Sequence, residues 1–133
     1  MGKYIIRGGK RISGEYRVGG AKNAALPILA ATVLTGGVSV IHDCPRISDT
    51  FNSIEILKTI GCKAVFDGGT VTVDSSCAHN CEIPDSLSGL MRSSVIFLGS
   101  LVGRFGKAGV CYPGGCETEG PFLPKCKMKN FEP

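Results

Sequence analysis

The chain lacks both a strong charge imbalance and a long uninterrupted apolar run. Its 133 residues carry 15 basic and 11 acidic side chains, a formal net charge of +4, which is too small to indicate a nucleic-acid partner. The most apolar segment, residues 87–102, contains Arg92 and small polar residues, which favours a buried helix over a membrane span. Arg7, Lys10 and Arg11 interrupt the early apolar run, so no signal peptide is indicated. We therefore expect a cytoplasmic protein that binds neither nucleic acid nor membrane.

Seven cysteines stand at irregular spacings, which is typical of reduced thiols rather than of a disulfide framework. Three of them lie in or beside expected strands and are most simply small buried apolar groups: Cys44, Cys62 and Cys111. A zinc site formed by Cys77, His79 and Cys81 is an alternative, but no second pair of ligands follows at a recognised spacing. We expect neither a metal nor a cofactor.

Hydrophobic patterning predicts a β-α-β-α-β-β unit at the start of the chain. Two short strands are expected at residues 4–7 and 15–18, separated by a glycine-rich turn. A helix over residues 24–34 follows, with Asn23 as its N-cap and Gly36 just beyond its end.

The second half of this unit has clear start and stop signals. A strand at residues 38–42 leads to a helix that Ser48 caps and Gly61 ends. Apolar side chains recur every three residues on one face of that helix: Phe51, Ile54, Leu57 and Ile60. Strands at 62–66 and 70–74 are joined by an Asp-Gly-Gly turn, which is a strong hairpin signal.

A second copy of the unit begins at residues 82–83. An apolar helix is expected from about residue 86 to 104, then a strand at 108–112, and the copy breaks off at the Pro-Gly-Gly-Cys loop of residues 113–116. A repeated unit that stops within its second copy suggests a larger architecture that this chain does not finish. The alternation of helices and strands predicts an α/β fold with helices packed against sheets.

Gly19, Gly20, Lys22 and Asn23 stand together where a polar loop enters the first helix. A helix N-terminus offers free N–H groups and a favourable dipole to an anion. The glycines would let the backbone approach a ligand, Lys22 adds positive charge, and Asn23 can donate from its side chain. The same residues also fit ordinary helix punctuation. The segment does not match the GxxxxGK[ST] pattern, which argues against a nucleotide-hydrolysing P-loop.

Two further residues have two interpretations each. Arg92 lies among apolar residues of an expected helix, so its guanidinium either reaches solvent or points at a buried anion. Cys116 ends a flexible glycine loop, where a thiol is either reactive or an idle surface group.

Three motifs in register carry a family resemblance: GAKNAALP at residues 20–27, LMRSS at 90–94 and YPGGC at 112–116. They resemble the UDP-N-acetylglucosamine 1-carboxyvinyltransferase family of enolpyruvyl transferases, and the similarity runs through residues 1–116 with the same order and spacing. The paralogous shikimate-pathway transferases share the fold but carry neither the Gly-Ala-Lys-Asn run nor this cysteine loop.

The resemblance implies an inside-out α/β barrel architecture of two domains, each built of three βαβαββ units, of which this chain holds about one and a half. Residues 1–20 would be N-terminal strands that join the second domain, and residues 21–116 a partial first domain. Residues 117–133 would be a divergent tail. A complementary chain that supplies the second domain is then a candidate partner.

The resemblance also implies an activity. The family transfers the enolpyruvyl group of phosphoenolpyruvate to the 3-hydroxyl of UDP-N-acetylglucosamine, with release of phosphate, as the first committed step of peptidoglycan synthesis. Lys22 and Asn23 would contact the phosphate and carboxylate of phosphoenolpyruvate, and Arg92 would face the nucleotide-sugar side of the cleft. Cys116 would donate a proton to the substrate methylene, form a covalent adduct with phosphoenolpyruvate and be the target of fosfomycin.

The sequence departs from the family pattern after Cys116, where it reads ETEGPFLP at residues 117–124. The arginine of the closing loop and the later aspartate base are absent. We therefore expect the chain alone to be inactive or nearly so. A non-catalytic fragment, or a partner-binding remnant of the enzyme, is the alternative.

Overall fold

The computed structural model describes residues 3–110. The first part of this region holds the main sheet and the two helices that cover it: α1 (Lys22–Thr35), β1 (Val38–Ile41), α2 (Ser48–Ile60), β2 (Lys63–Asp67) and β3 (Thr70–Asp74). The second part is made of shorter elements: β4 (Glu82–Ile83), α3 (Asp85–Ser88), the 3-10 helix η1 (Arg92–Val95), α4 (Ile96–Phe105) and β5 (Gly109–Val110). This combination of helices and strands confirms the predicted α/β class.

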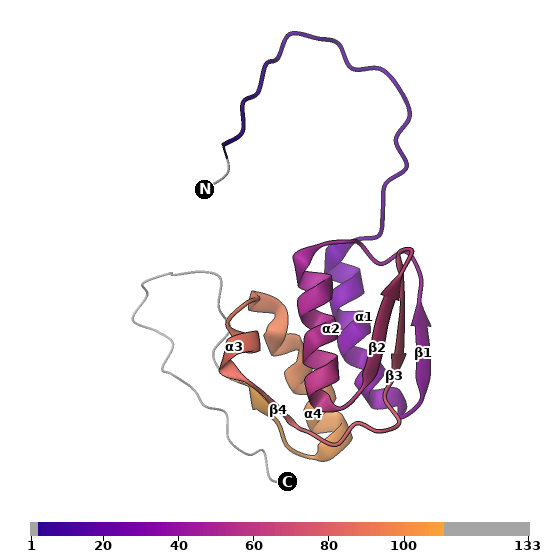
Figure 1. Cartoon of the computed structure of the whole chain (residues 1–133), viewed down its shortest axis with the longest axis vertical. Coiled ribbons are helices and arrows are strands. Elements are labelled where there is room, and N and C mark those ends of the chain that lie inside the picture. The colour runs from indigo at the N-terminus through magenta and orange to yellow at the C-terminus, as the bar shows by residue number, and fades with distance from the viewer. Residues whose placement is uncertain (1–2, 111–133) are drawn as a thin grey trace.

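The sheet packs against helices on one face only. Its strands lie in the order β1-β3-β2 with antiparallel pairing throughout, and α1 and α2 cover one face (Figure 1). On the covered face Val71 and Val73 are fully buried, as alternation along a half-buried strand requires. The other face carries the exposed side chains of Val38, Val40 and Val65. Helix α4 packs on the far side of α1, so that α1 lies between the sheet and α4.

The hairpin between β2 and β3 is formed as predicted. Asp67 pairs with Thr70, which leaves a two-residue turn. Both turn residues have positive φ angles, 52° at Gly68 and 88° at Gly69. A type I′ turn needs left-handed backbone at both central positions, and glycine supplies it without steric cost.

Helix α1 begins earlier than the sequence suggests. Its first residue is Lys22 and its N-cap is Ala21, because the N–H groups of Ala24 and Ala25 both donate to the carbonyl oxygen of Ala21. The prediction that Asn23 is the N-cap was therefore wrong, since Asn23 is the second helical residue. The predicted end is confirmed, with Gly36 in the left-handed conformation that commonly terminates helices.

Helix α2 is close to its prediction. It includes Ser48, so the N-cap is Ile47 and the predicted cap was wrong by one residue. Gly61 ends the helix with φ 101° and donates its N–H to the carbonyl oxygens of Leu57 and Lys58. The predicted apolar face is buried except at Phe51, which is 39% exposed and stacks at a tilt on Phe66 of β2, with 5.2 Å between ring centroids.

The predicted long helix of residues 86–104 is broken. Helix α3 ends at Ser88 with Gly89 as its C-cap, and Met91 then adopts an extended conformation (φ −147°, ψ 137°) before η1 and α4 begin. The buried hydroxyl of Ser94 donates to the carbonyl oxygen of Ser88 across the break, 3.1 Å away. No helix formed by residues 3–110 combines the length and apolar character that a membrane crossing requires. Beyond the break, β5 pairs in parallel with β4 and forms the described part of the predicted strand 108–112.

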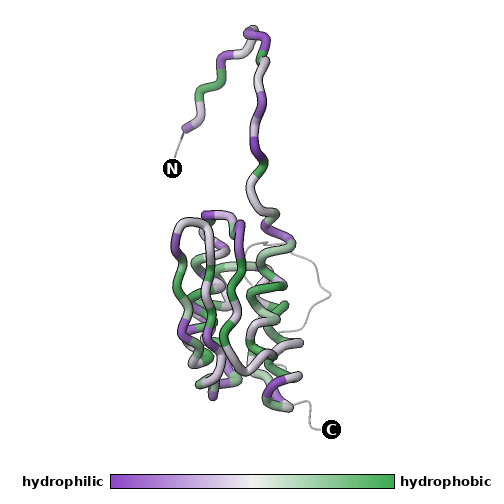
Figure 2. The backbone as a smooth tube through the Cα atoms, turned by 90° about the vertical axis from the view of Figure 1, so that its right-hand side faces the viewer, coloured by the Kyte–Doolittle hydropathy of each residue, from purple (hydrophilic) through white to green (hydrophobic). Residues whose placement is uncertain are grey.

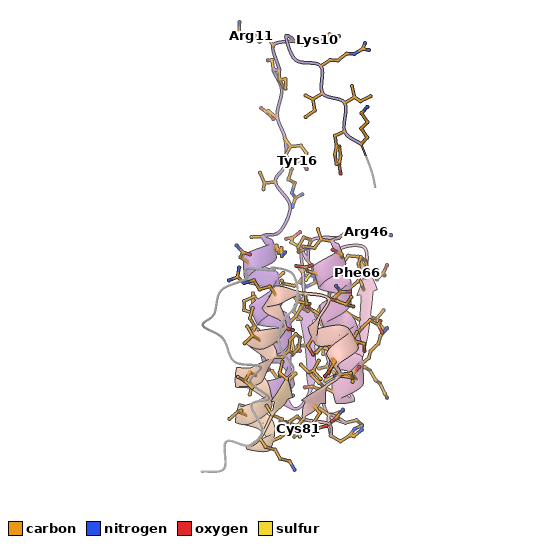
Figure 3. All side chains as sticks on the ribbon, turned by 90° about the vertical axis from the view of Figure 1, so that its left-hand side faces the viewer. Lys10, Arg11, Tyr16, Arg46, Phe66 and Cys81 are labelled. Atoms are coloured by element: carbon orange, nitrogen blue, oxygen red, sulfur yellow. The ribbon has the colours of Figure 1, made fainter. Side chains whose placement is uncertain are left out.

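The strands predicted at residues 4–7 and 15–18 are not formed. Residues 3–20 run away from the packed region without regular structure (Figure 1), and Figure 3 shows Lys10, Arg11 and Tyr16 on this outlying segment. Hydrophilic and hydrophobic residues are mixed along it (Figure 2), and Tyr4 and Ile6 are more than nine-tenths exposed. A strand needs a neighbouring strand to accept and donate its backbone hydrogen bonds, and none lies beside this segment within residues 3–110.

At Gly20, just before α1, the segment of residues 3–20 comes into contact with the packed region. A Cβ atom at residue 20 would overlap the carbonyl oxygen of Asp43, whereas Gly19 has open space around it. Asp43 itself has a left-handed backbone (φ 55°) in the turn after β1, a conformation that Asp tolerates better than most residues. The close approach that Gly20 permits is thus an approach to the backbone of this chain.

The segment of residues 77–81 closes the C-terminal end of α2. The backbone N–H groups of His79 and Asn80 both donate to the carbonyl oxygen of Ile60, and the side-chain amide of Asn80 donates to the carbonyl oxygen of Thr59. These bonds satisfy carbonyl groups that a helix end leaves free. Within residues 3–110 no group of three or more His, Cys, Asp or Glu side chains is arranged to hold a metal ion, so the zinc interpretation finds no support there.

The predicted burial of two cysteines is confirmed. Cys44 and Cys62 are each 5% exposed, and burial raises the pKa of both thiols, with smaller contributions from neighbouring charges. Cys77 is exposed. Cys111 lies outside the described residues.

The contact between Gly20 and Asp43 predicts the effect of Gly20→Ala. The added methyl group must push two backbone segments apart, so we expect the free energy of unfolding in urea to fall by about 1–3 kcal/mol. Gly19→Ala is the matched control and should change it by less than about 0.5 kcal/mol. Equal unfolding free energies for the two variants would contradict the contact.

The burial of the cysteines predicts an order of reaction with iodoacetamide at neutral pH. The thiolate is the reactive form, so Cys77 should be alkylated well before Cys44 and Cys62, whose thiols are shielded and have raised pKa values. Peptide mass mapping over time gives the order directly. In urea the three rates should converge; early labelling of Cys62 in the folded chain would refute the assignment.

Candidate functional site

A hollow of about 640 Å³ lies where α1, α2 and the break before α4 meet. Lys22 and Asn23 of α1 line it on one side, Asp49 of α2 contributes next to them, and Arg92 lines it from the start of η1. Three of the four site residues predicted from sequence, Lys22, Asn23 and Arg92, are thus brought together around one cavity. Its volume is within the range of about 300–1,000 Å³ that is typical of small-molecule pockets.

Two helix N-termini meet at this hollow. Helices α1 and α2 begin at the same end of the packed region (Figure 1), and neither has a side-chain N-cap. The first N–H groups of an α-helix have no partner within the helix, and the aligned peptide dipoles give this end a partial positive charge. No acidic side chain stands in the first turn of α1, so none of its own carboxylates offsets this partial charge.

Lys22 forms an ion pair with Asp49 in the first turn of α2. The Lys22 side chain is 51% exposed and the Asp49 side chain 20%. The pair joins the first turns of two helices that are far apart in sequence. Asp49 was not predicted as a site residue, because its position beside Lys22 follows only from both helices starting at the same end.

Asn23 and Arg92 are both exposed at the wall of the hollow. Met91 is buried, with its sulfur 3.9 Å from the hydroxyl of Ser53 in α2. The buried Met91 side chain holds the extended residue that precedes Arg92. Arg92 is therefore the first residue of η1 and does not lie in the interior of a long helix. The sequence allowed two interpretations: the guanidinium reaches solvent, or it points at a buried anion. Arg92 is exposed, as the first interpretation requires, and it also lines the hollow.

The fourth predicted residue, Cys116, lies outside the described residues, so its proposed role stays a prediction. The side chains at the hollow carry two positive charges, on Lys22 and Arg92, and one negative charge, on Asp49. Together with the two helix ends, this arrangement favours a ligand with more than one negative charge.

Comparison with known proteins gives the family. The model of the EPSP synthase family, described as 3-phosphoshikimate 1-carboxyvinyltransferase, matches residues 6–120. UDP-N-acetylglucosamine 1-carboxyvinyltransferase 2 of Caldanaerobacter subterraneus subsp. tengcongensis is 54% identical over 117 residues, which are 88% of this chain and 28% of that protein. UDP-N-acetylglucosamine 1-carboxyvinyltransferase of Methylacidiphilum infernorum is 45% identical over 116 residues, 87% of this chain and 27% of that protein.

The fold agrees with these sequence matches. The structure of the enolpyruvyl transferase NikO from Streptomyces tendae superimposes with a TM-score of 0.69 at 36% sequence identity, over 76% of this chain and 24% of that one. The chain therefore spans little more than a quarter of the length of the relatives that it matches. Since the family model covers most of the residues and a solved enolpyruvyl transferase shares the fold, the chain belongs to the EPSP synthase family.

Proposed function

We propose that the chain forms part of an enzyme that transfers the enolpyruvyl group of phosphoenolpyruvate to the 3-hydroxyl of UDP-N-acetylglucosamine and releases phosphate. The observation that carries this proposal is the convergence of Lys22, Asn23 and Arg92 on one hollow at two helix N-termini. Relatives named for this activity, at 42–54% identity, support the choice of substrates. The reaction would be the first committed step of peptidoglycan synthesis, in the cytoplasm, and would thereby serve cell shape and division.

The proposed roles follow the charges of the site. Lys22, Asn23 and the first N–H groups of α1 would bind the phosphate and carboxylate of phosphoenolpyruvate, which carries several negative charges at neutral pH. Arg92 would face the nucleotide sugar. The 3-hydroxyl of the sugar attacks C2 of the enol ester and gives up its proton, while C3 gains a proton. Phosphate then leaves C2 as C3 loses a proton, which restores the C2–C3 double bond in the product. Fixed cationic groups favour this sequence because they stabilise the departing phosphate without having to reorganise. Cys116 would supply the proton to C3.

We further propose that the described region is part of an inside-out α/β barrel, with residues 21–116 in a first domain. The exposed segment of residues 3–20 would pair with a second domain or with a complementary chain that provides it. The exposed apolar side chains of Tyr4, Ile6 and Tyr16 support this assignment, since they gain most from a surface that covers them. Residues 117–133 would be a divergent tail outside the domain.

The hollow is bordered by exposed residues and the chain spans about a quarter of its relatives' length. We therefore expect the chain alone to bind phosphoenolpyruvate weakly and to have little or no transferase activity. A non-catalytic fragment that retains this binding site is the second candidate, and the same titration tests the site in both cases.

Titration of the chain with phosphoenolpyruvate, followed by backbone amide chemical shifts, tests the proposed site. We expect saturable shifts centred on Lys22, Asn23 and Arg92 with a dissociation constant of about millimolar. Lys22→Ala should weaken binding by about two- to fivefold, because it removes the ammonium group. Lys58→Ala is the matched control, since Lys58 is an exposed, ion-paired lysine in the last turn of α2.

Shifts that saturate elsewhere on the molecule, or equal affinity for the two alanine variants, would contradict the proposed site. Amide dispersion in the same spectra verifies that each variant is folded.

A further inference from the structure

Asp49 is a carboxylate in a hollow whose other charged side chains, among the described residues, are the cations Lys22 and Arg92. A fixed negative charge beside a site for a phosphorylated anion repels that anion. We therefore looked to the contacts of Asp49 for a role that offsets this repulsion. Asp49 pairs with Lys22 and lies in the first turn of α2, where the helix dipole stabilises a carboxylate.

The Lys22–Asp49 pair differs from the other ion pair of α2. Glu55 and Lys58 lie three residues apart on the same helix, with side chains 54% and 49% exposed. Asp49 is only 20% exposed and holds a lysine from a different helix. It therefore constrains where the Lys22 ammonium lies relative to the N-terminus of α1, whereas Glu55 constrains only its own helix.

We propose that Asp49 is a positioning residue that acts through Lys22. Its carboxylate serves as an internal counter-ion that holds the ammonium at the hollow and yields it to an incoming anion of higher charge. The inference rests on the proposed function, since it assigns a role at the same site. It adds a basis for specificity. The Asp49 carboxylate competes with monoanions for the Lys22 ammonium, but a phosphate ester with two or three negative charges displaces it.

Asp49→Asn tests the proposal with phosphoenolpyruvate and acetate as the two probes. Without the competing carboxylate, we expect phosphoenolpyruvate to bind about two- to fivefold more tightly, the range that a partly exposed ion pair supports. Acetate should shift the Lys22 and Asn23 amides of the variant at concentrations that leave the unsubstituted chain unchanged. Glu55→Gln is the matched control, because it removes an ion-paired carboxylate of the same helix and changes the net charge equally; both affinities should stay unchanged.

Two further measurements separate this role from a merely structural one. The ¹⁵Nζ signal of Lys22 should move in Asp49→Asn and stay in place in Glu55→Gln, and Asp49→Glu should restore the selectivity against acetate. Asp49→Ser provides a second uncharged variant if the asparagine variant does not fold.

The outcomes are distinct. In one outcome, the unsubstituted chain binds phosphoenolpyruvate at Lys22 and both uncharged variants bind it equally well or more weakly. That result overturns this inference and leaves the proposed function standing. No saturable binding by any folded variant overturns the proposed function and this inference with it.

Discussion

The structure depends on one constraint: α1 and α2 begin at the same end of the sheet, with their N-termini side by side. Strand β1 connects them and runs back along α1, so α2 starts where α1 started (Figure 1). Two partial positive charges are thereby brought together. The Lys22–Asp49 ion pair links the two first turns across this end, and the buried Val71 and Val73 of β3 lie on the sheet face that the helices cover.

The break before α4 completes the site. In an uninterrupted helix over residues 86–104, Arg92 would lie in the middle of an apolar stretch. Instead Met91 is extended and buried against α2, and Arg92 starts a new turn at the edge of the hollow. The hydrogen bond from Ser94 to Ser88 holds the two sides of the break together. A local loss of helical hydrogen bonds is thus offset by packing, and it moves a guanidinium to the wall where an anion can meet it.

Sequence reasoning located the elements whose determinants are local. The glycines at 36, 61, 68 and 69 adopt the left-handed backbone that their positions require, and each lies at the predicted turn or helix end. The candidate residues Lys22, Asn23 and Arg92 were also found from sequence, through helix-start chemistry and a family resemblance. The N-caps were misplaced by one or two residues, because alanine and isoleucine occupy positions where polar caps are the usual signal. Features that depend on tertiary contacts were missed: the break at Met91, the pairing of Asp49 with Lys22, and the absence of strands in residues 3–20, which have no partner strand within residues 3–110.

The central claim is that the paired helix N-termini and Lys22 form an anion site. A crystal structure of the chain grown with phosphoenolpyruvate tests it most directly. The account predicts the phosphate within hydrogen-bonding distance, about 2.7–3.2 Å, of the Lys22 Nζ and the Asn23 backbone N–H, with Asp49 released from Lys22. A ligand bound elsewhere, with the Lys22–Asp49 ion pair intact and the hollow filled only by solvent, would contradict it.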